Sequence, residues 1–304
     1  MEHYFFNLNC YLNKYYFSSN GYSSPHDSNK LCGTFFYPWM VGVTDGDGTF
    51  SISNQKGSWI LTFAIAQSCY NIKLLAFIKI YLNIGSINID KISNMAMFRI
   101  RDRKILLNHI IPIFDSYPLL TTKYYYYDRF KKVLNILENN NLSKSEKDTL
   151  ILSLLKLEPG NKYISPAWND LNIMSKPWVI GFIEAEGSFY IVNKNNNPPR
   201  MTLGFGITQK LDKKVLEKIA SLMNLETKIR YKEKHNYYIL DTTKNTNINS
   251  IIDYFDNQMI GMKNIEFKIW KKSLIYKNDY DRLKSYQERL RKLKTLTPNL
   301  DLFK

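Results

Sequence analysis

The sequence predicts an α+β fold made of two similar units related by a pseudo-twofold axis, each running helix, strand, strand, helix, strand, strand, helix. Three observations lead to this prediction. The chain contains a long internal repeat, each copy of the repeat alternates between helical and strand spacing of its apolar residues, and a length of 304 residues is enough for two domains.

Four anchors carry the repeat. Residues 39–52 match residues 178–191 at an offset of 139, and residues 63–67 match residues 205–209 at an offset of 142. Residues 110–115 match residues 251–256 at 141, and Lys123 matches Lys263 at 140. The predicted organisation is therefore an N-terminal extension over 1–35, which we expect to be poorly ordered, a first unit over 36–135, a linker over 136–176, a second unit over 177–275 and a basic tail over 276–304.

Each unit is expected to open with a short helix that ends at its acidic residues. Pro38 and Pro177 are placed in the first helical turns, where proline is tolerated, and Gly48 and Gly187 are expected to form left-handed C-terminal caps. Alternating apolar residues then predict two strands in each unit, around 50–53 and 62–66 and around 188–191 and 204–208.

A helix and two more strands should follow in each unit. The apolar stripe predicts helices over 72–82 and 214–223, and strands are expected at 85–89, 97–101, 228–232 and 237–240. In the linker, Ser143 and Glu146 form a capping-box pattern that predicts a helix through Leu157, stopped by Pro159 and Gly160. Residues 277–294 should form a basic amphipathic helix.

Composition limits the classes of function. The chain has 42 Lys and Arg against 27 Asp and Glu, a formal charge of +15, which favours a polyanionic partner over an ordinary solvated basic surface. The most apolar stretch, 62–82, is interrupted by polar residues, so a membrane-spanning helix is not expected. Three unevenly spaced cysteines, Cys10, Cys32 and Cys69, support neither a disulfide framework nor a cysteine zinc site and favour a reducing compartment.

The origin of the chain can also be inferred from composition. Asn (31) and Tyr (22) are frequent, as expected from A+T-rich codons, and the N-terminus contains no Arg before Arg99, unlike a transit peptide. These features are typical of a protein encoded in the mitochondrion.

The first helix of each unit carries small residues four apart, Gly42 and Gly46 in the first copy and Gly181 and Ala185 in the second. Such a face either packs under its own sheet or allows two helices to approach closely, and its recurrence favours the helix pair. A parallel pair would bring the acids that end the helices together. Two facing carboxylates repel each other unless a cation lies between them, so the pair indicates a site for Mg²⁺ or Mn²⁺. A single Asp-Gly sequence would instead be interpreted as a turn on the surface, but the acid recurs in both copies.

These motifs resemble a known family. Residues 41–48 (VGVTDGDG) and 180–187 (IGFIEAEG) are similar to the two defining motifs of single-chain LAGLIDADG homing endonucleases, and the resemblance extends over nearly all of residues 36–275. It implies that the two motif helices form the domain interface and that two curved sheets form a saddle over double-stranded DNA. It also implies cleavage of both strands of a long asymmetric site across the minor groove, with short 3′ overhangs, by a monomer.

The resemblance assigns the site residues by position. It implies that Asp47 and Glu186, with the backbone carbonyls of Gly46 and Ala185, bind metal, and that the metal activates water and stabilises the departing 3′ oxygen. Asp45 and Glu184 are interpreted as structural, since two residues turn them about 200° away around the helix. Polar residues near the metals are expected to organise water and stabilise phosphate charge; these are Gln67, Gln209, Lys123 and Lys263. Asn71 aligns with Lys213, where some relatives carry a further basic residue.

The strand faces opposite the core are expected to contact DNA, with polar side chains meeting base edges and basic ones meeting phosphates, although any one of them could also belong to an ordinary solvated face. On the first sheet these residues are Ser51, Ser53, Gln55, Thr62, Ala64, Arg99 and Arg101. On the second they are Tyr190, Val192, Lys194, Thr202, Lys228, Arg230 and Lys232.

Two functions remain open from the sequence. The first is a site-specific DNA endonuclease encoded by a mobile intron, favoured because both metal-binding acids are present. The second is a maturase that binds group I intron RNA and assists splicing, alone or combined with cleavage. The four histidines form no zinc or nuclease pattern, which argues against another nuclease class.

Overall fold

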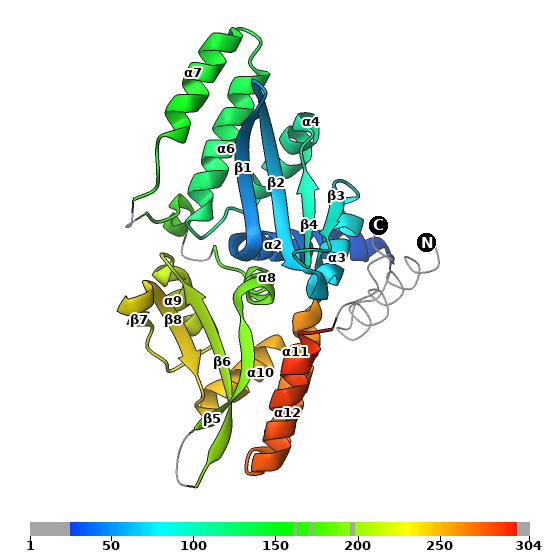
Figure 1. Cartoon of the computed structure of the whole chain (residues 1–304), viewed down its shortest axis with the longest axis vertical. Helices are drawn as coiled ribbons and strands as arrows, with labels where there is room; N and C mark the ends of the chain where they lie inside the picture. The colour runs from blue at the N-terminus through cyan, green and yellow to red at the C-terminus, as the bar shows by residue number, and fades with distance from the viewer. Residues whose placement is uncertain (1–24, 161–162, 171–172, 195–197, 297–304) are drawn as a thin grey trace.

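The computed structural model describes residues 25–160, 163–170, 173–194 and 198–296. Within them the chain forms two units, one above the other in Figure 1, each built on an antiparallel sheet of four strands. The strand orders are β1-β2-β4-β3 and β5-β6-β8-β7, so the second sheet repeats the topology of the first. This repetition confirms the predicted α+β fold of two pseudo-twofold-related units.

The first unit begins with the motif helix α2. Its elements are α2 (Pro25–Asp47), β1 (Gly48–Gln55), β2 (Ser58–Ser68), η2 (Cys69–Asn71), α3 (Ile72–Leu82), β3 (Ser86–Asp90), β4 (Met95–Ile100), α4 (Arg103–Ile105), the π-helical turn η3 (Leu106–Ile110), α5 (Ile111–Ser116) and α6 (Lys123–Glu138). The linker contributes α7 (Lys144–Leu155) and η4 (Pro166–Asn169).

The second unit follows the same order. Its elements are α8 (Lys176–Glu186), β5 (Ser188–Lys194), β6 (Arg200–Gln209), α9 (Lys213–Leu222), β7 (Arg230–Lys232), η5 (Glu233–His235), β8 (Tyr237–Thr242), α10 (Asn245–Phe255), α11 (Met262–Ser273), η6 (Leu274–Tyr276) and α12 (Tyr280–Leu293). Each unit thus has a helical segment between its last strand and its final helix, in addition to the elements predicted.

Two local predictions differ from the structure. Pro38 lies inside α2, because this helix starts at Pro25 and not near residue 38. The expected extension over residues 1–35 lies outside the described residues up to residue 24, and its remainder belongs to α2. The predicted helix over 277–294 is confirmed by α12, which buries Leu283, Tyr286 and Leu290.

Matching aromatic clusters form the cores of the two units. Phe50 on β1 packs against Phe114 at 5.1 Å between ring centroids, and in the second unit Phe189 packs against Trp270 at the same separation. These side chains are buried beneath the sheets by the helical layer. Each such aromatic contact contributes about 0.5–1.5 kcal/mol beyond its burial, so the repeated pattern also stabilises the repeated fold.

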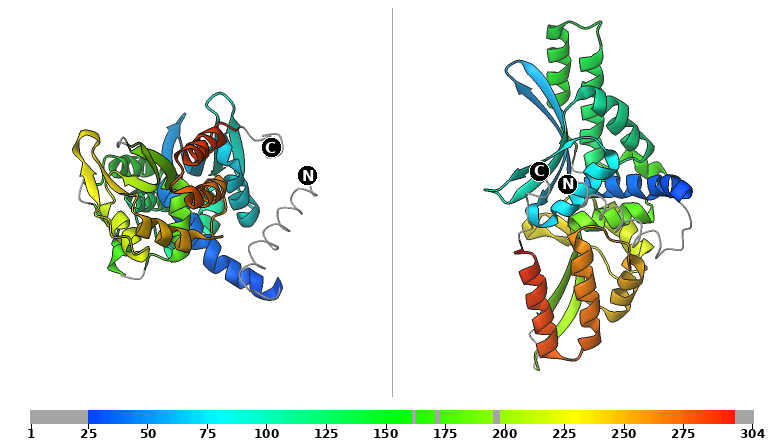
Figure 2. Two further views of the ribbon diagram at one scale, coloured as in Figure 1. Left: turned by 90° about the horizontal axis from the view of Figure 1, so that it is seen from below. Right: turned by 90° about the vertical axis from the view of Figure 1, so that its right-hand side faces the viewer.

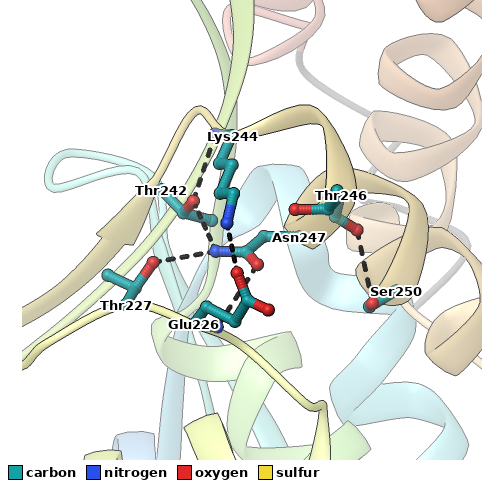
Figure 3. Close-up of polar contacts among 7 residues, drawn as sticks. All are labelled: Glu226, Thr227, Thr242, Lys244, Thr246, Asn247 and Ser250. Atoms are coloured by element: carbon teal, nitrogen blue, oxygen red, sulfur yellow. Dashed lines mark hydrogen bonds and ion pairs between the residues drawn. The ribbon is translucent and has the colours of Figure 1, made fainter.

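A buried polar cluster fixes the turn between β8 and α10 in the second unit (Figure 3). The Asn247 amide donates to Thr227 Oγ1 at 2.8 Å and to Thr242 Oγ1 at 3.0 Å, and its oxygen accepts from the Glu226 amide at 3.3 Å. Lys244 forms an ion pair with Glu226 beside it. The cluster therefore ties the segment that leads into β7 to the start of α10.

Candidate metal and nucleic-acid site at the unit boundary

The two motif helices, α2 and α8, pack against each other at the junction of the units (Figures 1 and 2). A side chain on Gly42 would collide with the backbone of Trp178, and one on Gly181 would collide with the backbone of Trp39. A side chain on Gly46 would instead collide with the Cβ of Ala185. The small residues therefore allow a close and reciprocal contact between helix backbones, as the repeated motif predicted.

Gly48 and Gly187 do not adopt the left-handed conformation that was expected. Gly187 is extended, with φ −71° and ψ 146°, and Gly48 already belongs to β1. A Cβ on Gly48 would lie 2.6 Å from the Thr44 carbonyl oxygen, and one on Gly187 would lie 2.8 Å from the Ile183 carbonyl oxygen. Glycine is needed here because the strand leaves directly over the last helical turn.

Asp47 and Glu186 end α2 and α8, and both carboxylates are partly buried beside the helix junction. Burial raises the pKa of Asp47. The pKa of Glu186 is raised by burial and, next, by the negative charge of Asp47. The charge of Asp47 therefore disfavours the ionised form of Glu186, and the positive charges of Lys123 and Lys263 partly offset the rise in pKa of both acids.

Three of the four predicted polar residues contact the acids or the neighbouring backbone. Gln67, from β2, donates to Asp47 Oδ2, and Gln209 hydrogen-bonds Glu186. The Lys123 ammonium donates to the carbonyl oxygens of Thr44, at 3.2 Å, and of Gly46. Lys263 instead forms an ion pair with Glu266 at 3.4 Å, so the two lysines are arranged differently.

Burial lowers the pKa of Lys123, while the charges of Asp45, Asp47, Glu186 and Asp212 oppose this shift. An ammonium thus lies against the Gly46 carbonyl that was predicted to bind metal.

The donor set at this junction suits a hard divalent cation. The predicted ligands, the carboxylates of Asp47 and Glu186 and the carbonyl oxygens of Gly46 and Ala185, are all oxygen ligands of the kind preferred by Mg²⁺. Among the residues that the structure describes, no group of three or more His, Cys, Asp or Glu could hold a metal.

Asp45 and Glu184 hold the loops that precede the lysine-bearing helices, which confirms their structural interpretation. Asp45 accepts hydrogen bonds from the amides of Leu120 and Thr121 at 2.8 and 3.1 Å, and Glu184 accepts from the amides of Ile260 and Gly261. Burial raises the pKa of Asp45 to about 6 and that of Glu184 to about 7.

The two copies differ at one buried contact. Trp178 Nε1 donates to Asp45 at 2.9 Å, whereas the equivalent atoms in the other copy, Trp39 Nε1 and Glu184 Oε2, have no hydrogen-bond partner among the described residues. The longer glutamate side chain replaces the aspartate at this position, so the pseudo-symmetry of the junction is broken here.

Two residues near the site were not recognised from the sequence as a matched pair. Asn71 ends η2 before α3, and Asp212 precedes α9, so these two residues occupy equivalent N-cap positions. The structure therefore corrects the alignment of Asn71 with Lys213. The available signal was the preference of Asn and Asp for the position before a helix. Their contacts cross to the opposite unit and are described below.

The strand registers place the predicted DNA-facing residues on common faces. Ser51 pairs with Thr62, and Ala64 pairs with Arg99; in the second sheet Val192 pairs with Thr202. Thr62 and Ala64 are 8% and 6% exposed, so these two offer little surface. Further residues of the same faces were not named from the sequence. Ser58, Met95 and Asp241 lie outside the strand segments that were predicted, whereas the others lie within them and were not assigned to a face: Ser86, Asn88, Met97, Thr208 and Tyr237.

Not all basic residues of these faces point freely outward. Arg230 forms an ion pair with Asp241 at 2.5 Å, and Arg101, just beyond β4, donates to Thr62 Oγ1 at 3.3 Å. Lys228 lies before β7 and not within it. Lys194 and Lys232 are exposed. None of the described helices is long and apolar enough to cross a membrane.

Comparison with known proteins agrees with this geometry. A family model described as LAGLIDADG endonuclease matches residues 40–134 and 179–274. A probable intron-encoded endonuclease, Cox1-I1b, of Schizosaccharomyces pombe is 40% identical over 269 residues, covering 85% of this chain and 69% of that protein. A probable intron-encoded endonuclease, aI3, of Kluyveromyces lactis is 30% identical over 273 residues, covering 79% and 66%.

Solved structures share the fold. The I-GzeII LAGLIDADG homing endonuclease in complex with its DNA target has a TM-score of 0.69 and 27% identity, covering 86% of this chain and 98% of that one. The I-SmaMI LAGLIDADG homing endonuclease bound to cleaved DNA has a TM-score of 0.68 and 25% identity, covering 84% and 95%. The two repeats, their paired motif helices and these relatives show that the chain belongs to the LAGLIDADG endonuclease family.

Proposed function

We propose that this chain is a site-specific endonuclease that cleaves both strands of double-stranded DNA in the homing of its intron. The observation that carries the proposal is that Asp47 and Glu186 end the two packed helices α2 and α8, where the charge of Asp47 acts on Glu186, beside two sheets whose first strands carry polar residues on their more exposed faces. The structural relatives bound to DNA support a duplex as the partner.

The two acids are proposed to bind Mg²⁺ together with the carbonyls of Gly46 and Ala185. The metal would supply an activated water and charge stabilisation for the departing 3′ oxygen. A relative's structure bound to its uncleaved target in the presence of calcium supports a divalent ion in this family. Cleavage across the minor groove with short 3′ overhangs is part of the proposal.

The remaining site residues have distinct proposed roles. Gln67 and Gln209 orient the carboxylates of Asp47 and Glu186 through their amide groups. Lys123 and Lys263 place positive charge next to the acids, where a phosphate would carry developing negative charge. The residues of the strand faces position the duplex through phosphates and read base edges in the major groove.

The test is cleavage of a duplex that joins the two exon sequences flanking the intron. We expect Mg²⁺-dependent cutting of both strands, and a loss of at least about 100-fold in rate for Asp47→Asn or Glu186→Gln, because several kcal/mol of metal-assisted stabilisation is removed. Binding of the duplex should persist in both variants.

Matched controls are Asp128→Asn and Glu217→Gln, which change exposed acids in i,i+4 pairs with Lys132 and Lys213. Both should cut at the wild-type rate. Full activity of Asp47→Asn, or an equal loss in the controls, would contradict the assignment of the acids.

A second candidate function is a maturase that binds group I intron RNA. One observation favours it: α12 packs on β5 through its apolar side and exposes Arg282, Lys284, Arg289 and Lys292 on the other. Wild-type protein that binds the intron RNA tightly but cuts neither DNA strand would establish this role in place of the nuclease.

We also propose a mitochondrial location. It is supported by the relatives' intron-encoded names and by a mitochondrial protein of Saccharomyces cerevisiae that is 34% identical over 179 residues.

A further inference from the structure

The helices that carry the two lysines are each held at their start by the opposite unit. Asp212, at the N-cap of α9 in the second unit, accepts hydrogen bonds from the Thr122 amide at 2.8 Å and the Thr122 hydroxyl at 3.0 Å. Thr122 is the N-cap of α6, and Lys123 is the first residue of that helix. The position of Lys123 in the first unit therefore depends on a carboxylate of the second.

The reverse contact is also made. Asn71, at the N-cap of α3 in the first unit, accepts a hydrogen bond from the Met262 amide at 2.8 Å. Met262 is the first residue of α11, and Lys263 follows it. The two contacts are related by the pseudo-twofold axis, and they join residues that are 90 and 191 positions apart in the chain.

At the start of each of these two helices, three successive backbone amides donate hydrogen bonds to side chains, and these side chains come from both units. At α6, Asp45 of the first unit accepts from Leu120 and Thr121, and Asp212 of the second accepts from Thr122. At α11, Glu184 of the second unit accepts from Ile260 and Gly261, and Asn71 of the first accepts from Met262. These amides precede or begin a helix and have no intrahelical partner, so the side chains satisfy them.

The two cross-unit residues differ in chemistry. The Asn71 amide group also donates to Gln67 Oε1 at 2.9 Å, and Gln67 in turn donates to Asp47. Asn71 therefore connects the acid of its own unit with the lysine of the other. A carboxylate at Asp212 can only accept, and both of its hydrogen bonds go to Thr122.

We propose that Asn71 and Asp212 are positioning residues of the reaction, each placing the lysine of the opposite unit, and that Asp212 acts on one half of the site while Asn71 acts on both. The inference rests on the proposed endonuclease function. Lys123 directly follows Thr122, and its ammonium donates to the carbonyls of Thr44 and Gly46, so a shift of the helix start would move this ammonium. A displacement of about 1 Å near reacting groups can cost about 100-fold in rate.

The experiment measures nicking of each strand separately, on the exon-junction duplex labelled on one strand or the other, with full-length protein and Mg²⁺. Asp212→Ala should slow one strand at least about tenfold and leave the other within about twofold, because only the Lys123 half loses its support. Asp212→Asn should restore the slow strand, since an amide oxygen can accept from Thr122 as that of Asn71 does from Met262. Asn71→Ala should slow both strands.

Asp253→Ala, which removes an exposed acid on α10 of the same unit, is the matched control and should leave both rates unchanged. Hydrogen exchange of the Thr122 and Lys123 amides should be faster in Asp212→Ala while the sheets stay protected, which verifies the folded state.

Equal slowing of both strands by Asp212→Ala, or no recovery in Asp212→Asn, would overturn the positioning role while leaving the endonuclease proposal intact. A wild-type protein that cuts neither strand has a different meaning: the proposed function fails, and the positioning role fails with it.

Discussion

At the scale of single residues, the helix junction depends on the absence of side chains. A Cβ at Gly42 would overlap the Trp178 backbone, which cannot move without shifting α8, whereas a Cβ at Gly160 in the linker would meet nothing within 4 Å. Gly42→Ala should therefore destabilise the protein by about 3 kcal/mol or more, because overpacking here strains two backbones. Gly160→Ala should be within about 0.5 kcal/mol of wild type. Urea unfolding of both variants checks this, and equal stability of the two would contradict the close helix contact.

The burial of Asp212 should make the stability of the folded protein depend on pH. Its pKa is raised, mainly by burial, so the folded state holds the proton more tightly than the unfolded state. The folded protein should then lose stability as the pH rises from about 4 through the raised pKa. Asp212→Asn cannot ionise, so this part of the pH dependence should disappear. The measurement is the free energy of unfolding across pH 3–8 in the presence of a chelator.

Asp90 serves as a control because its pKa is shifted in the opposite direction to that of Asp212. Hydrogen bonds from Ser93 and the Ile92 amide lower its pKa, so the stability that it contributes is lost as the pH falls through that lowered value. Asp90→Asn should reduce the loss of stability on acidification. A change of the same sign in both variants would show that burial of Asp212 does not govern its titration.

At the scale of elements, the linker helix α7 supports the β1–β2 hairpin. Trp59 Nε1 donates to Asp148 Oδ1 at 2.6 Å. Asp148→Ala should cost about 1 kcal/mol and speed hydrogen exchange in residues 53–60, because a charge-assisted hydrogen bond is lost. Leu152→Ala, at a side chain of α7 that is 51% exposed, should change neither quantity. Unchanged exchange in Asp148→Ala would show that the hairpin holds its position without α7.

Elements with a strong local signal could be predicted from the sequence. The helices over 72–82 and 214–223, the Ser143–Glu146 capping box and the strand alternation all match the structure, since each depends on neighbours within a few residues. The pairing of the motif helices could also be predicted, because both copies of the repeat carry small residues four apart. Gly48 and Gly187 show the limit of this reasoning: glycine was required, but for space and not for a left-handed conformation.

What could not be predicted depends on contacts between distant residues. The hydrogen bonds of Asn71 and Asp212 connect one unit with the other, and no pattern in the neighbouring sequence predicts their partners. Likewise, the repeat placed Lys123 and Lys263 as equivalents, yet Lys263 turns to Glu266, a residue whose counterpart in the first copy is not acidic. Pseudo-symmetry in sequence therefore predicts where a residue lies better than what it contacts.

At the scale of the whole molecule, the charge of +15 makes DNA affinity a test of the strand-face assignment. Because each phosphate contact releases counterions, the affinity should fall steeply between about 50 and 200 mM salt, with a slope of about −0.9 per contact in a plot of log K against log salt. Lys232→Gln, on the exposed face of β7, should reduce that slope by about 1. Lys132→Gln removes the same charge from α6, where the lysine pairs with Asp128, and should leave the slope unchanged. Fluorescence anisotropy with the exon-junction duplex measures both. A flat salt response, or the same change for both lysines, would mean that the duplex does not lie on the strand faces and that the excess charge acts only as a diffuse field.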